Sequence, residues 1–326
     1  MQAANGKPVS DFGARRAHNV DAAVYGARAA YIGGAAGTAT VLAGKMFHIP
    51  ISGTMAHSWV MTFDSEYDAF KAYAESYPDG TVLLVDTYDV LKSGVPNAIR
   101  TAREVLEPMG KKLIGIRLDS GDLAYLSKEA RKMLDEAGLS DCMIVASNSL
   151  DEYTISSLNR QGAKIDSYGV GERLITSSST PVFGAVYKLV AIQKDGKFIP
   201  KIKISETAEK ITNPGIKEVY RVYDENGKAV ADYLAVKGEQ IRDFDPVRYV
   251  DPVNYWKNRS FVGCRFKKLQ VPVFEKGKRI YDLPDIEEIR QYVKDQLENE
   301  IWEEEQRFEN AHTHYLDMSP AMFELK

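Results

Sequence analysis

The feature that most constrains this chain is a regular alternation of short apolar runs and helical patterns over roughly its first 190 residues. Six strand-then-helix units follow one another at roughly 30-residue spacing, which predicts parallel strands joined by helical crossovers. The apolar runs are continuous, as in a sheet covered on both faces. The predicted strands are 9–12, 49–52, 81–86, 112–119, 143–148 and 165–170, and the predicted helices are 21–32, 66–76, 97–106, 124–137 and 152–161.

Two architectures accommodate this pattern, a doubly wound sheet and a (β/α) barrel. A doubly wound sheet gathers its polar site at one switch point and has a glycine-rich phosphate loop after its first strand. No GxGxxG follows residues 9–12. Polar residues instead follow nearly every predicted strand, and a barrel builds its site from many loops at the carboxyl ends of its strands. The barrel is therefore favoured.

The pattern becomes antiparallel after about residue 183. Two hairpins are predicted from their Asp-Gly and Asn-Gly turns. A long acidic helix is predicted over 285–310, with its charges on a solvated face. The chain is thus expected to comprise a barrel region, 1–190, and a region of antiparallel strands and a C-terminal helix, 191–326, that packs on the barrel. The paired hairpin strands are 186–193 with 198–205 and 219–223 with 230–234.

Composition narrows the class of partner and the compartment. The chain has 42 Lys and Arg against 46 Asp and Glu, a net charge of −4, which argues against nucleic acid or an anionic membrane as an obligatory partner. Its two cysteines, Cys142 and Cys264, have no second ligand at metal-site spacing. No apolar run approaches the ~18 residues of a membrane span, and the first residues do not resemble a secretory signal. A cytoplasmic protein with reduced thiols is predicted.

Two arginines follow the first predicted strand, in Asp11-Phe-Gly-Ala-Arg-Arg16. A guanidinium keeps its charge and donates paired hydrogen bonds to carboxylate or phosphate. Arg15 and Arg16 are therefore candidates for holding an anion. Structural salt bridges are the alternative.

The stretch Gly115-Ile-Arg-Leu-Asp-Ser-Gly-Asp122 carries a denser set of polar groups. Arg117 and Asp119 are two residues apart, so they face the same side of a strand, here the barrel lumen. A buried charge pair is costly unless it has partners or a function. We expect Asp119 to accept from sugar hydroxyls, and Ser120 and Gly121 to offer backbone N–H groups to an anion. A cap for the following helix is the alternative role of Asp119.

Polar residues also end the other predicted strands. Asp86 is placed to stabilise a developing cation or, alternatively, to cap a helix. Two further pairs suit phosphate binding through backbone N–H groups, although turn glycines alone would explain the second pair. The recurrence of such residues at successive strand ends is a stronger indication than any one of them. The two pairs are Ser147 with Asn148 and Gly169 with Gly171.

One histidine, His57, lies in Gly53-Thr-Met-Ala-His-Ser-Trp59, between the predicted strand 49–52 and a helix predicted from Ser58 onward. The N-terminus of a helix stabilises added negative charge. An imidazole at this position is a candidate phosphoryl acceptor as well as a base. A hydrogen-bonded core histidine is the alternative.

Seven collinear segments together closely resemble nicotinate phosphoribosyltransferases. They span nearly the whole chain in the same order, which makes a chance similarity improbable. The segments are Phe12-Gly-Ala-Arg-Arg16, Gly53-Thr-Met-Ala-His-Ser-Trp59, Leu84-Val-Asp-Thr-Tyr88, Ser93-Gly-Val-Pro-Asn97, Gly115-Ile-Arg-Leu-Asp-Ser-Gly-Asp-Leu123, Gly169-Val-Gly171 and Val186-Tyr-Lys-Leu189.

The resemblance implies a type II phosphoribosyltransferase built on an irregular, incomplete (β/α) barrel. Such enzymes join nicotinate to 5-phosphoribosyl 1-pyrophosphate, giving nicotinate mononucleotide and pyrophosphate, the first step of NAD salvage from nicotinate. ATP phosphorylates a histidine that corresponds to His57, and hydrolysis of the phosphohistidine drives the transfer. The resemblance thus implies ATP and Mg²⁺ as cofactors and a homodimer with a shared active site.

The resemblance also assigns residues to roles. Asp86 and Asp119 would stabilise a ribosyl cation-like state and hold hydroxyls or Mg²⁺. Phe12 would stack on the pyridine ring, and its acid group would be held by Arg15, Thr54 and Arg117. The 5-phosphate would be held by Ser147, Asn148, Gly169 and Gly171, with added charge from Lys188.

Two positions and the start of the chain refine this expectation. The related nicotinamide enzymes have an aspartate where this chain has Ala39, so nicotinate is expected to be preferred over nicotinamide. Many relatives have Thr where this chain has Glu172, whose charge must point away from the phosphate loop or meet Arg173. Relatives also have an N-terminal α/β region and a first barrel strand before the segment that matches Phe12. Their absence predicts a truncated chain with weak activity or none.

Three alternatives stay open. The chain could be a non-catalytic fragment that still binds phosphoribosyl pyrophosphate or a partner. It could be a barrel lyase with Lys188 as a Schiff-base amine. It could also be a quinolinate phosphoribosyltransferase, which would need a more cationic pocket for two carboxylates.

Overall fold

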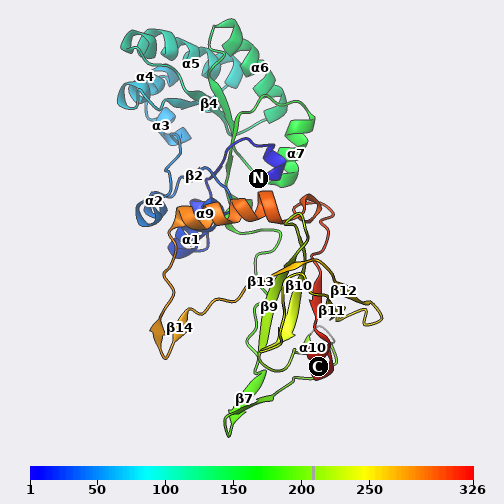
Figure 1. Ribbon diagram of the computed structural model, residues 1–326. Helices are drawn as coiled ribbons and strands as arrows, with labels where there is room; N and C mark the ends of the chain where they lie inside the picture. Colours follow the sequence, from blue (N-terminus) through cyan, green and yellow to red (C-terminus); the bar gives the residue numbers. More distant parts are fainter. Residues whose placement is uncertain (208–209) are drawn as a thin grey trace. The chain divides into compact units, whose positions relative to one another are not determined.

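The computed structural model describes residues 1–207 and 210–326. The chain divides into two compact units, Met1–Val182 and Phe183–Lys326, shown in Figure 1. The first unit carries the parallel sheet and the second the antiparallel strands. The predicted packing of the second region on the barrel stays a prediction. No helix in the described ranges combines the length and apolar character of a membrane span.

The sheet of the first unit has six strands, all paired in parallel. Because the first strand pairs with the sixth, the strands follow the circular order of a (β/α) barrel, which confirms that prediction. The barrel is incomplete: beyond the second strand, Thr38 forms only an isolated parallel bridge with Ile51. The strands are β1 (Val9–Asp11), β2 (Gly37–Thr38), β3 (Val82–Leu84), β4 (Gly115–Leu118), β5 (Met143–Ala146) and β6 (Ser167–Val170).

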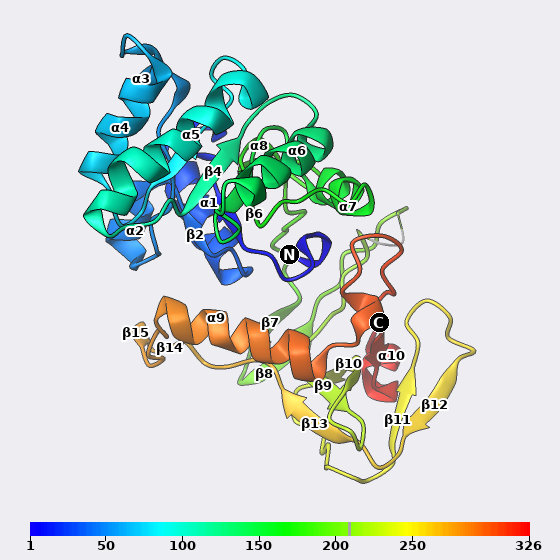
Figure 2. The same ribbon diagram turned by 90° about the horizontal axis from the view of Figure 1, so that it is seen from above.

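Helices connect these strands, and α4, α5 and α6 lie side by side outside the sheet (Figures 1 and 2). Several begin at a side chain that accepts a backbone N–H in the first turn, as at Asn19, Ser65, Asp122 and Asp151. The α-helices are α1 (Val20–Ile32), α2 (Val41–Phe47), α3 (His57–Met61), α4 (Glu66–Ser76), α5 (Val95–Thr101), α6 (Leu123–Glu136), α7 (Glu152–Arg160) and α8 (Glu172–Ile175). Short 3-10 or π turns are η1 (Gln2–Ala4), η2 (Ala14–Arg16), η3 (Val90–Gly94), η4 (Ala102–Leu106) and η5 (Glu107–Met109).

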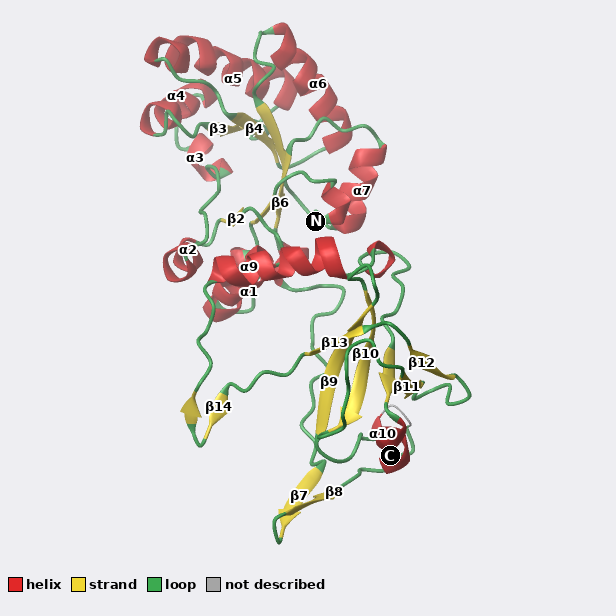
Figure 3. Cartoon of the chain, in the orientation of Figure 1, coloured by secondary structure: helices red, strands yellow, loops and turns green. Residues whose placement is uncertain are grey.

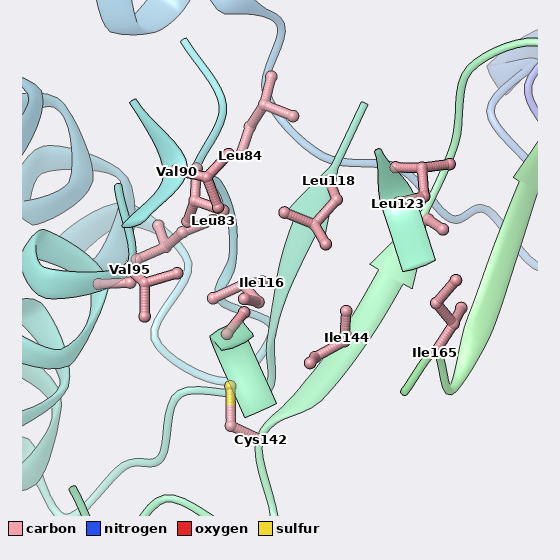
Figure 4. Packing of buried hydrophobic residues seen from close by; sticks show 14 of the residues in the cluster. Leu83, Leu84, Val90, Val95, Ile116, Leu118, Leu123, Cys142, Ile144 and Ile165 are labelled. Atoms are coloured by element: carbon pink, nitrogen blue, oxygen red, sulfur yellow. The ribbon is translucent and has the colours of Figure 1, made fainter. Parts of the chain in front are cut away.

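The core of the first unit is built on the continuous apolar strands. Leu83, Ile116, Leu118 and Ile144 are fully buried and pack together between the sheet and its helices (Figure 4). Burying each such side chain contributes about 1.5–3 kcal/mol. This burial makes β3, β4 and β5 a rigid support for the polar residues that follow them.

Two details of the first unit differ from the prediction. The predicted strand 49–52 is reduced to the bridge at Ile51, and β2 was not predicted because a Gly-Thr pair is too short to show a period. The helix predicted over 97–106 begins at Val95, since Pro96 fits a first helical turn, and its last residues, Ala102–Leu106, form a π turn.

The second unit is built around a six-stranded sheet in the order β12-β11-β16-β10-β9-β13. The buried Tyr233 packs edge-on against Phe261 and Phe266 in its core. Both predicted hairpins are present, as β7–β8 and β9–β10, but the strands of the first are shorter than predicted, because residues 186–190 and 201–205 are not part of β7 or β8. The strands are β7 (Ala191–Lys194), β8 (Lys197–Pro200), β9 (Lys217–Tyr223), β10 (Ala229–Val236), β11 (Val247–Val250), β12 (Asn258–Phe261), β13 (Arg265–Lys268), β14 (Phe274–Glu275), β15 (Lys278–Arg279) and β16 (Leu316–Met318).

The long acidic helix predicted over 285–310 is shorter in the structure. Helix α9 (Ile286–Asp295) continues only as a π turn, η7 (Gln296–Glu300), and Ile301 is extended. The Gln306 side chain donates to the carbonyls of Leu297 and Ile301, which replaces helical hydrogen bonds. The segment ends with a 3-10 turn, η8 (Glu303–Glu305), and α10 (Pro320–Leu325) follows (Figure 3).

Candidate active site

A cavity of about 490 Å³ lies in the first unit, beside the carboxyl ends of the parallel strands. Residues at or just after the ends of all six parallel strands line it, as expected for a barrel site. Its lining residues include Phe12, Arg15, Arg16, Ala39, Gly53, Thr54, Met55, Ala56, His57, Arg117, Asp119, Ser147, Asn148, Ser149, Gly169, Gly171, Glu172 and Arg173.

Arg117 on β4 organises this cavity. Its Nε donates to Ser147 Oγ at 2.8 Å, its Nη1 to Thr54 Oγ1 at 2.9 Å and its Nη2 to Asp119 Oδ1 at 2.9 Å. The guanidinium carbon also lies 5.2 Å from the centre of the Phe12 ring, a cation–π contact. These three hydrogen bonds fix the orientation of the mostly buried guanidinium. The N–H donors of Arg117 that they do not use are left to bind an anion in a bidentate manner.

Asp119 and Asp86 place two carboxylates next to this cation. Burial alone would raise the pKa of Asp119, but the hydrogen bond from Ser147 and the charge and hydrogen bond of Arg117 lower its pKa below the ordinary value. Asp86 lies beneath the cavity lining, where its Oδ2 accepts from the Asp119 backbone N–H at 3.1 Å and from Ser120 Oγ at 2.5 Å. Its Oδ1 is buried with no hydrogen-bond partner in the described residues.

The imidazole of His57 lies between these carboxylates and a hydroxyl. Its Nε2 is 3.6 Å from Asp119 Oδ2 and 3.9 Å from Asp86 Oδ1, and its Nδ1 is 3.2 Å from Thr87 Oγ1. His57 begins the short helix α3, and 39% of its side chain is exposed. The ring is therefore accessible to a reactant, unlike a sealed core histidine.

The loops that follow β5 and β6 also line the cavity, with Asn148, Ser149 and Gly169 among their residues. Asn148 and Ser149 both have positive φ, 88° and 51°, a strained arrangement that functional sites often hold. Only glycine fits at position 169, because a Cβ there would lie 2.4 Å from the Phe12 ring. Gly169 and Gly171 both line the cavity and have no side chain, so the backbone there can approach a ligand closely.

The charges at the rim are mainly cationic. Within the described ranges, the structure gives Arg15 no ion-pair partner, so its charge is available to a ligand. Glu172 forms an exposed pair with Arg16 at 3.6 Å, a contact worth little in water. The expectation that Glu172 meets Arg173 is thus replaced by a pair with Arg16.

Sequence comparison identifies the family. The profile of the Nicotinate phosphoribosyltransferase (NAPRTase) family matches residues 8–227, and that of the nicotinate phosphoribosyltransferase C-terminal domain matches residues 216–326. The chain belongs to the nicotinate phosphoribosyltransferase family. The resemblance found in its motifs is therefore confirmed.

Curated relatives agree with this membership. A nicotinate phosphoribosyltransferase of Bacillus subtilis is 51% identical over 310 residues, which cover 95% of this chain and 62% of that protein. One from Dictyostelium discoideum is 36% identical and covers 98% of this chain and 62% of its own length. The chain thus spans about three fifths of the length of these nicotinate phosphoribosyltransferases.

Solved structures share the fold. The crystal structure of human nicotinic acid phosphoribosyltransferase superposes with a TM-score of 0.83 at 25% identity, covering 99% of this chain and 71% of that one. A nicotinate-nucleotide pyrophosphorylase from Pyrococcus furiosus gives a TM-score of 0.64 at 28% identity, covering 91% of this chain and 67% of that one. The expected fold of an incomplete (β/α) barrel with antiparallel additions is confirmed.

The structure brings together most of the site residues expected for a nicotinate phosphoribosyltransferase. Ser120 and Gly121 are not in the cavity lining, and the Ser120 hydroxyl donates to Asp86. Lys188 is an exposed residue of the second unit, and its phosphate-binding role stays a prediction. The residues that line the cavity or contact His57 as expected are Phe12, Arg15, Thr54, His57, Asp86, Arg117, Asp119, Ser147, Asn148, Gly169 and Gly171.

Sequence reasoning missed Thr87, Ser149 and Arg173. Thr87 lies within a recognised family motif, and only the three-dimensional contact with His57 reveals its place. Ser149 and Arg173 directly follow predicted site segments, so extending each segment by one or two residues would have included them.

Proposed function

We propose that this chain carries the catalytic cavity of a nicotinate phosphoribosyltransferase. The reaction transfers the 5-phosphoribosyl group from phosphoribosyl pyrophosphate to nicotinate, forming nicotinate mononucleotide and releasing pyrophosphate, the first step of NAD salvage from nicotinate. The observation that carries the proposal is the placement of Arg117, Asp119 and His57 around one accessible cavity. Family membership supplies the reaction.

The pyridine acid fits beside Phe12 and the arginines. The Phe12 ring offers an aromatic face, and Arg15 and Arg117 offer charge-assisted hydrogen bonds to the carboxylate. Thr54 helps to fix Arg117. Ala39 also lines the cavity and adds no negative charge, which favours nicotinate over nicotinamide.

The ribosyl group would lie between the carboxylates and the glycine-containing wall. Ribosyl transfer builds positive charge at the sugar, and an ionised Asp119 stabilises this charge. Asp86 adds charge behind it. The backbone around Ser147, Asn148, Gly169 and Gly171 would bind the 5-phosphate, with Arg173 nearby.

ATP coupling would use His57 as a phosphoryl acceptor. With two carboxylates facing Nε2, the neutral ring is expected to keep its proton on Nε2, and Nδ1 is then the nucleophile. The Nδ1 lone pair attacks the γ-phosphorus, an N–P bond forms, and the P–O bond to the leaving ADP breaks. The Nε2 proton stays between the ring and the carboxylates, which offset the positive charge.

Mg²⁺ fits the donor set of this site. It commonly binds one or two carboxylates together with substrate phosphates, and Asp119 and the unpartnered oxygen of Asp86 are such donors. The described residues contain no cluster of three or more protein ligands suited to a metal, so substrate oxygens and water would complete its shell. The ion would offset pyrophosphate charge when bound.

A cytoplasmic location and a homodimer with a shared site are part of the proposal. The location agrees with two free, buried cysteines, Cys142 and Cys264, because disulfides form in oxidising environments such as the extracellular space and are rare in the cytosol. Burial raises the pKa of Cys142 to about 12, so this thiol is expected to be unreactive.

The proposal is tested with γ-labelled ATP and with nicotinate plus phosphoribosyl pyrophosphate. The expected result is label on the wild-type chain that is lost in His57→Ala, together with ATP-stimulated formation of nicotinate mononucleotide at a low rate. Label that survives in His57→Ala would refute the phosphohistidine. Tight binding of phosphoribosyl pyrophosphate without turnover would instead support the non-catalytic fragment. Borohydride trapping at Lys188 would support the lyase, and tighter binding of quinolinate than of nicotinate would support the quinolinate enzyme.

A further inference from the structure

One recognised motif, Ser93-Gly-Val-Pro-Asn97, contributes no residue to the lining of the cavity in the described ranges. It forms the end of η3 and the start of α5. Gly94 packs on the segment that carries Thr87, and the side chains of Ser93 and Asn97 contact Glu66 of α4, the helix that holds the His57 segment. The motif therefore affects the site indirectly, by holding the segments that carry His57 and Thr87 in place.

Gly94 packs directly on the end of β3. A Cβ on Gly94 would lie 1.8 Å from the Val85 carbonyl oxygen and 2.8 Å from Val85 Cβ. The backbone of Gly94 is in an ordinary helical conformation, φ −58° and ψ −57°, so space requires the glycine here. Val85 immediately precedes Asp86 and Thr87, and it is fully buried.

The loop that carries Asp86 and Thr87 is tied at both ends. On one side the Val85 N–H donates to the Arg117 carbonyl of β4 at 3.1 Å. On the other, the Asp89 carbonyl accepts from Ser93 and Gly94 N–H groups at 3.0 and 2.8 Å, and the Asp89 carboxylate accepts from η3 N–H groups. The motif thus fixes where Thr87 lies.

The same motif also supports the His57 side. Ser93 Oγ and Asn97 Nδ2 both donate to the buried Glu66 carboxylate at the start of α4. Helix α4 in turn holds α3, because Trp59 Nε1 donates to the Ala69 carbonyl at 3.2 Å. One motif therefore anchors both partners of the contact between His57 and Thr87.

We propose that Thr87 is a positioning residue for His57, held in place by Gly94. With Nε2 facing two carboxylates, the Thr87 hydroxyl donates to Nδ1 and selects one tautomer and one ring orientation. When a phosphoryl group approaches Nδ1, this hydroxyl is free to rotate and donate to a phosphoryl oxygen. This inference deepens the proposed function and rests on it, because the orientation matters for phosphoryl transfer to His57.

The test compares Thr87→Val, which keeps the side-chain volume and removes the donor, with Thr87→Ser, which keeps the donor. Multiple-bond ¹H–¹⁵N NMR of histidine-labelled full chain reports the tautomer of each of the five histidines, and His57→Gln assigns the signal. We expect a single Nε2–H tautomer in wild type, a mixture in Thr87→Val, and recovery in Thr87→Ser. The amount of label transferred from γ-labelled ATP to the chain should fall about tenfold or more in Thr87→Val and recover in Thr87→Ser.

Gly94→Ala should change the His57 signal in the same direction. Gly80→Ala is the matched control, since Gly80 precedes β3 and has nothing within 4 Å of its would-be Cβ. An unchanged tautomer and unchanged labelling in Thr87→Val would overturn the inference. This result can be interpreted even if Gly94→Ala does not fold. A wild-type chain that takes no label but shows a Thr87-dependent tautomer would refute the proposed function and leave the positioning role standing.

Discussion

Arg117 on β4 and Asp119, which directly follows this strand, form an ion pair in which Nη2 donates to Oδ1 at 2.9 Å. Both side chains are at least four fifths buried and share the hydroxyl of Ser147. The pair links the group proposed to bind the pyridine acid to the group proposed to stabilise the ribosyl cation. Substitutions at either residue should therefore affect different steps of one reaction.

Arg117→Lys should weaken nicotinate binding. Lysine keeps the charge but lacks the planar fork that reaches Thr54, Ser147 and Asp119 together. We expect the KM for nicotinate to rise about 100-fold, with a smaller change in the KM for phosphoribosyl pyrophosphate. Steady-state kinetics with each substrate varied separately measures this split. Equal losses for both substrates would contradict the assignment.

Asp119→Asn should lose stability at neutral pH and activity at every pH. A carboxylate with a lowered pKa stabilises the folded state above its unfolded pKa of about 4, and this contribution is lost as the pH falls through the lowered folded pKa. The difference in free energy of unfolding between wild type and Asp119→Asn should therefore shrink toward acid. Urea unfolding at pH 7 and at pH 3 measures it. A difference that grows toward acid would contradict the structure.

Gly169→Ala should displace Phe12, because the added Cβ would lie 2.4 Å from its ring. We expect the KM for nicotinate to rise about tenfold, because the displaced Phe12 ring can no longer stack on the pyridine ring. Gly53→Ala is a control in the same cavity, since its nearest neighbour would be 3.9 Å away. Similar nicotinate KM values for the two variants would argue against stacking on Phe12.

Ala39→Asp should reverse the substrate preference. A new carboxylate in the cavity would repel nicotinate and accept from an amide. We expect nicotinate binding to weaken at least about tenfold and nicotinamide binding to strengthen relative to it. Calorimetric titration of both compounds against wild type and Ala39→Asp checks this. An unchanged ratio would place the pyridine acid elsewhere in the cavity.

A fifth prediction concerns the second unit. Burial and the nearby charge of Asp251 raise the pKa of Asp317 to about 6. A raised carboxyl pKa means that stability is full below the unfolded pKa near 4 and declines as the pH rises through about 6. Asp317→Asn should therefore be more stable than wild type at pH 8 by about 3 kcal/mol. Denaturant unfolding at pH 8 and at pH 4 compares them, and equal stability at both would disprove the raised pKa.

The parallel strands and most site residues could be predicted because both follow from local pattern. Continuous apolar runs specify buried strands, and polar residues at their ends must meet at one edge of a parallel sheet. Arg117 and Asp119 could also be placed on one face, since their spacing matches the strand period. The side chain of Glu172 could not be placed, because an exposed charge has several possible partners.

The features that could not be predicted depend on long-range packing. The two-residue strand β2 exists only because β1 lies beside it. The contact between Thr87 and His57 joins residues 30 positions apart, and the need for glycine at position 94 comes from the Val85 carbonyl. The end of α9 is set by Gln306, which bonds back to Leu297 and Ile301. None of these leaves a period or turn signal in the sequence.

The most direct test is the crystal structure of this chain with bound nicotinate mononucleotide. We expect the pyridine ring against Phe12, its carboxylate within hydrogen-bond distance of Arg15 or Arg117, and the 5-phosphate at the backbone of Asn148 and Gly171. A nucleotide bound outside this cavity, or one with its phosphate on Arg117 and its ring at the glycine wall, would contradict the assignment of the site.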